Sequence, residues 1–308
     1  TATAFSLKPP ASDLPARKSD GISVWDLPLK GRVISRLDSF AFGKLRWSPF
    51  NATLSMDTGN WHFRIEDAAL CGVETKGDIR VTRDTISLAL QPEAREKDID
   101  TTIACLLEKP DLIDGKFALT GRLETEGPPA MLSRNINGRM NLRAHDGRIY
   151  RFNLLSKALA VVNLTEIFRG KLPDLMEGGL AYESIDIEVE MQDSLLTVKE
   201  AVIDGASANI AGQGTIDLVT GETDMIVLVA PFKTVDAIVK FTPIINDWLG
   251  GTLVSIPVSV TGQFSDPDAV PLSPSAVGSS LMNLMKKTVN LPVKIISPLW
   301  ETDAPEDQ

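Results

Sequence analysis

The feature that most constrains this chain's fold is a repeated alternation of apolar and polar residues. Residues 195–218 read LLTVKEAVIDGASANIAGQGTIDL, with a reversal at Asp204-Gly205. Residues 63–81, FRIEDAALCGVETKGDIRV, have the same form, and Phe63–Gly72 aligns without a gap on Leu196–Gly205. Alternation places successive side chains on opposite faces of a strand. The repeat therefore predicts a sheet that grows by adding copies of one unit.

Applied to the whole chain, the same pattern gives about fifteen strands joined mostly by short reversals. We expect hairpin turns at 57–60, at Arg83-Asp84 and at 145–147, and a strand over 98–109. Amphipathic helices are expected at 152–170, at 233–251 and at 275–289. A parallel sheet would need a crossover after every strand, so the pattern favours a long antiparallel meander.

Each alternating strand has an apolar face, which has to be covered. Three short helices cannot cover about fifteen strands, which stacked about 4.8 Å apart would span roughly 70 Å. The sheet must close into a sandwich or barrel, be covered by a protein partner, or hold lipid. From the strand pattern alone, the ordinary sandwich core is the favoured outcome.

Composition and motifs narrow the function. The 308 residues carry a formal net charge of −10, which argues against nucleic acid and, more weakly, against an anionic membrane surface. The longest apolar run, 225–232, is too short to span a bilayer, and residues 1–20 lack the pattern of a signal peptide. We expect the chain to be a fragment or a mature form.

Signs of catalysis are missing from the sequence. It has no GxSxG, P-loop, HExxH or complete GxGxxG motif, and its acidic residues are scattered along polar strand faces. His62 and His145 have no Ser or Cys pattern beside them. We expect no enzyme activity, no metal site and no cofactor.

Cys71 and Cys105 are the only two cysteines. Two interpretations are open at this point: a pair of buried thiols that act as small apolar side chains, or a disulfide between neighbouring strands. Closing the loop of 33 intervening residues would stabilise the fold by about 3–4 kcal/mol in the chain-entropy model.

A resemblance to a known family changes the balance. Residues 138–267 resemble the AsmA-like C-terminal region, in segments such as GRMNLRAHDGRIYRFNLLSKALAVVNLTEIF, VLVAPFKTVDAIV and IPVSVTGQFSDP. The positions that match the family pattern in order are Gly147, Asn163, Tyr182, Asp204-Gly205, Gly212, Gly214, Pro231 and Asp266-Pro267. The repeat unit at 63–81 is similar to the family's strand module, so the likeness extends toward the N-terminus.

This resemblance implies a protein of the Gram-negative envelope, in the periplasm and anchored in the inner membrane by a missing N-terminal helix. Its relatives are thought to form long β-grooves that carry phospholipid between the inner and outer membranes. The implied fold class is mainly β, an elongated twisted antiparallel sheet forming a half-open hydrophobic groove with about three short amphipathic helices. The periplasmic address also favours the Cys71–Cys105 disulfide.

The resemblance gives two functional hypotheses. In the first, the groove conducts phospholipid. In the alternative, the chain is a non-enzymatic scaffold or assembly factor for outer-membrane biogenesis, with envelope proteins as partners. The candidate lining residues are Leu196, Val198, Ile210, Ile216, Val227, Val254, Ile256 and Val258. An Asp at Val258 is expected to impede transfer while leaving the fold intact.

The domain organisation follows from the same argument. We expect a loose N-terminal segment (1–20), a first β repeat region (21–127), an AsmA-like C-terminal β region with helices (128–272), and a last amphipathic helix with a disordered acidic tail (273–308). The last helix is expected either to close the groove end, to touch the outer membrane or to pack as a cap.

Overall fold

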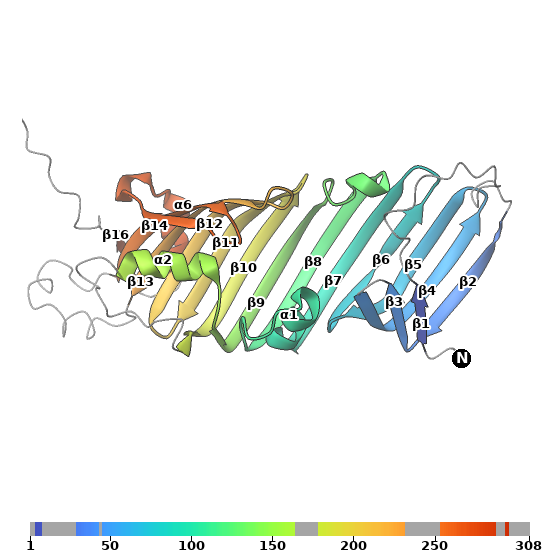
Figure 1. The fold of residues 1–308 in the computed structure, drawn as a ribbon, viewed down its shortest axis with the longest axis horizontal. Coiled ribbons are helices and arrows are strands. Elements are labelled where there is room, and N and C mark those ends of the chain that lie inside the picture. Colours follow the sequence, from blue (N-terminus) through green and yellow to red (C-terminus); the bar gives the residue numbers. More distant parts are fainter. Residues whose placement is uncertain are drawn as a thin grey trace, which may run out of the picture.

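The protein is one long, open antiparallel sheet with short helices at its ends and edges (Figure 1). The structure, a computed structural model, describes residues 4–7, 29–42, 45–163, 178–231, 253–287 and 293–295. Fourteen strands lie on one path in the order β1-β3-β4 and then consecutively to β15, while β2 also pairs with β4 and β16 with β14. The predicted fold class is confirmed, and the sheet is not a closed barrel.

Every pairing is antiparallel except the two at the ends, β1 with β3 and β14 with β16. The strands are β1 (Ala4–Leu7), β2 (Gly31–Leu37), β3 (Ser39–Phe42), β4 (Leu45–Asp57), β5 (Asn60–Leu70), β6 (Val73–Val81), β7 (Ile86–Asp98), β8 (Lys116–Gly127), β9 (Asn137–Ile149), β10 (Leu180–Gln192), β11 (Leu195–Gly205), β12 (Ala208–Asp217), β13 (Glu222–Pro231), β14 (Leu253–Gln263), β15 (Asp268–Pro271) and β16 (Val293–Ile295).

Three α-helices lie among the described residues: α1 (Ile99–Leu107), α2 (Asn153–Asn163) and α6 (Ser279–Lys287). Two short 3-10 turns, η2 (Pro129–Met131) and η3 (Pro274–Ala276), precede β9 and α6. The helices predicted near 152–170 and 275–289 therefore form where they are described. The helix predicted at 233–251 lies outside the described residues, as does the acidic tail.

The two copies of the repeated unit share a register shift at corresponding positions. In the pairing of β5 with β6 the register shifts between Ile65 and Ala68, and in that of β11 with β12 it shifts between Val198 and Ala201. These positions correspond in the alignment of Phe63–Gly72 with Leu196–Gly205. Such bulges increase the local twist of a sheet. The two copies therefore repeat a bent hairpin, with reversals at Cys71-Gly72 and after Asp204-Gly205 as predicted.

Two local predictions are wrong. Residues 99–107 form helix α1, not a strand, because Ile99, Thr102 and Ile103 follow the helical spacing and face the sheet. The expected turn at 145–147 is absent, since β9 continues to Ile149. Gly147 is needed there for close approach: a Cβ would overlap the Asp114 carbonyl oxygen and the Tyr182 hydroxyl.

Strands β8 and β9 pair directly across the expected domain boundary at 127–128, and residues 4–7 of the expected loose segment form β1.

Candidate functional site

One face of the sheet carries an uncharged row along its length, and the strand register shows this directly. A single row of cross-strand partners takes one residue from each strand between β2 and β14, except β3. The row is Ser35, Ala52, Ile65, Gly77, Leu90, Leu123, Gly138, Met191, Leu196, Ile216, Thr223 and Gly262. None of these residues is charged, and at about 4.8 Å per strand the row spans about 50 Å. We call the face that carries this row the apolar face.

Outside the part that α6 covers, the opposite face is polar, and several ion pairs lie on β9 to β11. Arg139 lies 2.5 Å and Lys199 3.1 Å from the Glu190 carboxylate, and Arg143 lies 3.1 Å from Asp186. The hydrogen bond from Arg139 and then that from Lys199 lower the pKa of Glu190. Charges on this face therefore have partners or solvent, and the two faces of the sheet differ sharply in polarity.

Over β4 to β10 most side chains of the apolar face are half-buried, shielded only by their neighbours. These include Leu54, Phe63, Ile79, Leu88, Leu90, Leu123, Met140 and Val189. Among the described helices, α1 packs at one end of β7 and β8 (Figure 1), and α2 reaches this stretch at Leu180, the first residue of β10. We call this stretch the open zone.

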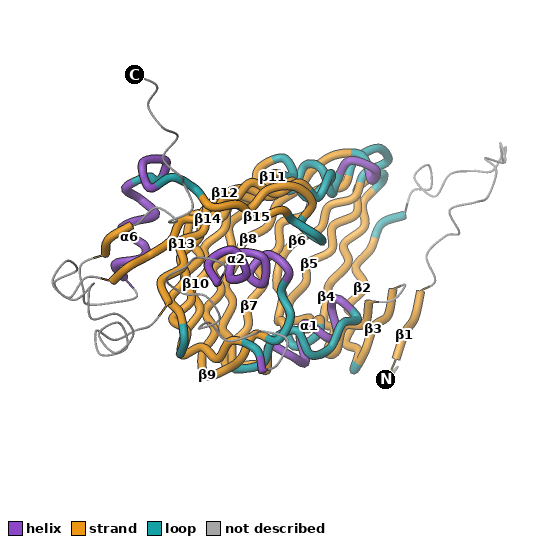
Figure 2. The backbone as a smooth tube through the Cα atoms, turned by 60° about the vertical axis from the view of Figure 1, so that its left-hand side comes forward, coloured by secondary structure: helices purple, strands orange, loops and turns teal. Residues whose placement is uncertain are grey.

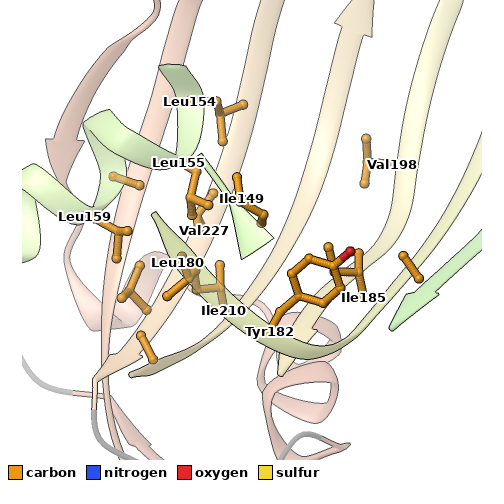
Figure 3. Packing of buried hydrophobic residues seen from close by; sticks show 14 of the residues in the cluster. Ile149, Leu154, Leu155, Leu159, Leu180, Tyr182, Ile185, Val198, Ile210 and Val227 are labelled. Atoms are coloured by element: carbon orange, nitrogen blue, oxygen red, sulfur yellow. The ribbon is translucent and has the colours of Figure 1, made fainter. Parts of the chain in front are cut away.

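At the C-terminal end, helix α2 covers the apolar face. Leu154, Leu155, Ala158, Leu159 and Val162 are all buried in one cluster with residues of β10 to β14. Figure 3 shows Leu155 and Leu159 directed toward Val227, Ile210 and Leu180. In this covered zone the sheet and α2 form a two-layer core, and Figure 2 shows α2 lying across the strands.

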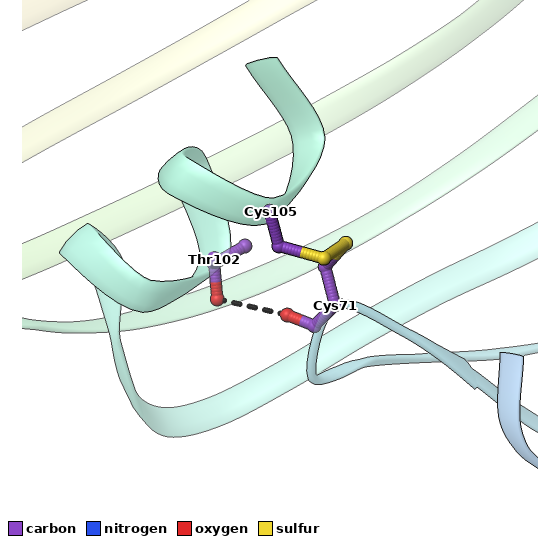
Figure 4. The surroundings of a disulfide bond; sticks show 3 residues. All are labelled: Cys71, Thr102 and Cys105. Carbon is purple, nitrogen blue, oxygen red and sulfur yellow. Dashed lines mark hydrogen bonds between the residues drawn. A yellow bond between two sulfur atoms is a disulfide. The ribbon is translucent and has the colours of Figure 1, made fainter. Parts of the chain in front are cut away.

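A disulfide fastens α1 to the sheet. Cys105 on α1 is bonded to Cys71 in the turn between β5 and β6, with 5.7 Å between their Cα atoms. The Thr102 hydroxyl donates a hydrogen bond of 3.0 Å to the Cys71 carbonyl oxygen (Figure 4). The predicted pairing is present, but it joins a helix to a turn instead of two neighbouring strands.

Comparison with known proteins gives one match. A model of the YhdP protein family matches residues 22–269. The chain belongs to the YhdP protein family. This is an AsmA-like family of the bacterial envelope, which confirms the resemblance at that level, whereas the narrower assignment to the AsmA-like C-terminal region stays a prediction. No curated protein and no solved structure matches the chain.

In this YhdP-family chain the predicted lining residues share one face, but they fall in different environments. Leu196 and Ile216 are partly buried and belong to the uncharged row, while Val198, Ile210, Val227, Ile256 and Val258 are buried in the cluster that contains α2. Val254 lies on β14 opposite Lys294, and its side chain is not among those described. Sequence reasoning missed the residues of the open zone, although their alternation in 63–90 gave the signal.

Val258 needs a different expectation from the sequence-based one. Its side chain is 0% exposed and lies between Val227 and Pro271 in the sheet. A carboxylate there would be buried in a packed core. We therefore expect Val258→Asp to damage the fold, so it cannot serve as a clean probe of transport.

Helix α6 packs as a cap on the opposite face of the same strands. Leu281, Leu284 and Met285 are buried against Val202 and Leu228. Among the three expectations for this helix, the described contacts match the packed cap.

A hollow of about 750 Å³ lies beside the start of α2. Its lining includes Asp100, Asp111, Asp114 and Tyr150, but the Asp114 carboxylate already accepts hydrogen bonds from the Arg148 backbone (2.5 Å) and the Tyr150 hydroxyl (2.7 Å). The described residues contain no group of three His, Cys, Asp or Glu side chains able to hold a metal ion. That the chain is not an enzyme stays a prediction.

The motif residues Gly147 and Tyr182 serve the fold around this hollow. The Tyr182 hydroxyl donates a 2.5 Å hydrogen bond to the Asp114 carbonyl oxygen. Burial, followed by the nearby Asp114 carboxylate, raises the pKa of Tyr182 to about 12.

Within the described part of the chain, no helix has the length and apolar character needed to cross a membrane.

Proposed function

We propose that the apolar face of this YhdP-family chain binds phospholipid acyl chains and conducts them between the inner and outer membranes. The observation that carries the proposal is the row of uncharged cross-strand partners from Ser35 to Gly262, unbroken over about 50 Å. A lipid tail lying across the strands meets no charge on this row.

The energetics favour such an occupant. Each methylene group removed from water contributes about 0.8 kcal/mol, so two ordinary acyl chains gain on the order of 20 kcal/mol. The half-buried side chains of the open zone offer apolar contact without a closed pocket. Headgroups can stay in water at the edge of the sheet, so no single residue has to act as a binding site.

The proposed location is the periplasm, with the full-length protein anchored in the inner membrane. Support comes from membership of an AsmA-like envelope family. The Cys71–Cys105 disulfide is consistent with an oxidising compartment. The proposed role involves no catalysis and no nucleic acid.

An alternative role as a scaffold for outer-membrane biogenesis is favoured by one observation. Helix α2 fills the apolar face at the C-terminal end with its own side chains. A scaffold would leave the open zone to be covered by a protein partner in the same way.

The deciding experiment is lipid extraction and mass spectrometry on protein purified from membranes without harsh detergent. Leu123→Asp places a charge on the uncharged row, whereas Arg122→Asp places the same charge on the opposite, exposed face of the same strand. We expect stoichiometric phospholipid with the parent chain and with Arg122→Asp, and its loss with Leu123→Asp. A lipid-free parent protein would favour the scaffold.

A further inference from the structure

Six exposed apolar side chains gather along one rim of the sheet, far apart in sequence. They are Met131, Phe152, Leu195, Leu218, Val219 and Phe264, each between 39% and 49% exposed. Met131 lies in the β8–β9 connection, Leu195 follows the β10–β11 turn, and Leu218 and Val219 form the β12–β13 turn. Phe264 follows β14, and its ring contacts Phe152 with 5.9 Å between centroids. We call this set the apolar rim.

Hydrogen bonds join these turns into a continuous edge. The Ser194 hydroxyl donates to the Arg134 carbonyl oxygen (2.8 Å), and the Leu218 amide donates to the Ser194 carbonyl oxygen (2.9 Å). The Phe264 amide donates to the Gly221 carbonyl oxygen (2.8 Å). Four connections of the sheet are thus held side by side, so their apolar side chains form a row.

Exposed large apolar side chains are most numerous in one part of this edge, although Leu29, before β2, is also 39% exposed near its other end. The earlier turns on the same edge, Thr58-Gly59 and Thr82–Thr85, contain no large apolar residue. On the opposite edge, the reversals at Cys71-Gly72 and Ala206-Ser207 are small or polar. Among the described residues, the exposed large apolar side chains on that side are Leu106 and Leu107 of α1 and Leu45 at the start of β4. The row therefore marks the C-terminal part of one edge.

We propose that the apolar rim inserts shallowly into a lipid surface and so places the C-terminal part of this edge of the apolar face against a membrane. The inference rests on the proposed function, because the rim lies at the edge of the apolar face. Leu218 lies two residues beyond Ile216 of the uncharged row, whereas Leu195 precedes Leu196 of that row and so points toward the opposite face at the same edge. A lipid leaving the face at this edge would pass directly between the rim side chains.

Backbone and charge at the rim are compatible with insertion. The Asp217 carboxylate accepts hydrogen bonds from the amides of Val219 (2.7 Å) and Thr220 (2.9 Å), so these polar groups are satisfied within the turn. Asp266 is paired with Lys157 at 3.1 Å. The remaining exposed charges of these turns include Asp193 and Glu222, which disfavour an anionic surface, and Arg134, which favours one. The geometry therefore points to a zwitterionic surface and to binding that depends little on salt.

The test is flotation of the protein with phosphatidylcholine vesicles. The double variant Leu218→Ser, Val219→Ser should bind about tenfold more weakly than the parent, because two exposed aliphatic side chains are lost. Leu106→Ser with Leu107→Ser removes two exposed apolar side chains from the other edge and should bind like the parent. Far-UV circular dichroism checks that both variants are folded.

A second measurement reports insertion directly. An environment-sensitive fluorophore on Leu218→Cys should shift to the blue when vesicles are added, and the same label on Leu107→Cys should not. A parent chain that does not float, a double variant that floats like the parent, or a label at 218 that stays unshifted would each overturn the proposal.

The outcome is separable from that of the proposed function. The rim variant should still carry stoichiometric phospholipid after purification, whereas Leu123→Asp should lose that lipid yet still float with vesicles. Loss of floating in Leu123→Asp, despite a normal circular dichroism spectrum, would count against a rim that acts independently.

Discussion

A carboxylate introduced in the covered zone should destabilise the protein far more than one in the open zone. At Val258 the side chain is 0% exposed and is surrounded by the cluster that α2 completes. Removing the buried valine costs about 1.5–3 kcal/mol. Holding a carboxyl group in that environment raises its pKa by up to about 3–5 units, which costs about 4 kcal/mol at neutral pH, where the cost is limited to that of protonating an Asp with an unfolded pKa of about 3.9. The sum approaches the whole stability of an ordinary domain, about 5–15 kcal/mol.

Leu123→Asp serves as the comparison. Leu123 is only half-buried on the open zone, so a carboxylate there keeps contact with water. We expect a loss of about 1–2 kcal/mol, mainly from the missing apolar contacts. The assay is urea unfolding followed by far-UV circular dichroism, with the midpoint compared among the parent, Val258→Asp and Leu123→Asp.

The pH dependence provides an internal check. A buried carboxyl group with a raised pKa destabilises the folded state less as the pH falls, because the unfolded chain then also binds the proton. Lowering the pH from 7 to about 5 should therefore restore part of the stability of Val258→Asp. Leu123→Asp should show little such recovery. If Val258→Asp unfolds at the same urea concentration as the parent, the assignment of β13 to β15 and α2 to a closed core is refuted.

Three further predictions follow from the described contacts. Cys71→Ala with Cys105→Ala should lower the free energy of unfolding by about 3–4 kcal/mol, and an unchanged urea midpoint would contradict the role given to the disulfide. Leu155→Ala on α2, 2% exposed, should cost about 2–5 kcal/mol, and a loss below 1 kcal/mol would mean that α2 is not a core element. The chain has two tyrosines, Tyr150 and Tyr182. Burial foremost raises the pKa of Tyr182 to about 12, and the hydrogen bond to Asp114 raises the pKa of Tyr150. Phenolate absorbance should therefore stay low at pH 10. Because the unfolded phenols ionise near pH 10, stability should fall as pH rises from 10 through 12, and a full phenolate signal from folded protein at pH 10 would argue against this packing.

The alternation of the sequence determined most of the sheet. Short reversals such as Asp57–Asn60 and Cys71-Gly72 lie where they were predicted, because turn residues act within a few positions of themselves. The period of two also determined which residues share a face, and the candidate lining positions with described side chains do so. These are local properties, so a single sequence contains them.

Other features depended on contacts between distant residues. Residues 99–107 are rich in β-branched side chains, yet they form a helix because Ile99 and Ile103 pack on the sheet and Cys105 is bonded to Cys71. Gly147 suggested a turn, although its actual role is to let the Tyr182 hydroxyl approach the backbone. In both cases the sequence pattern has two possible meanings, and tertiary packing selects one of them.

The division of the apolar face was also decided by the tertiary structure. Alternation makes Val258 and Leu123 look alike, since each is an apolar residue on the same face. Only the position of α2 makes one of them a core residue and leaves the other half-exposed. The apolar rim has the same origin, because residues from 131 to 264 become neighbours only when the sheet forms. Burial is a property of the assembled surface, so strand periodicity gives the face of a residue but not what covers it.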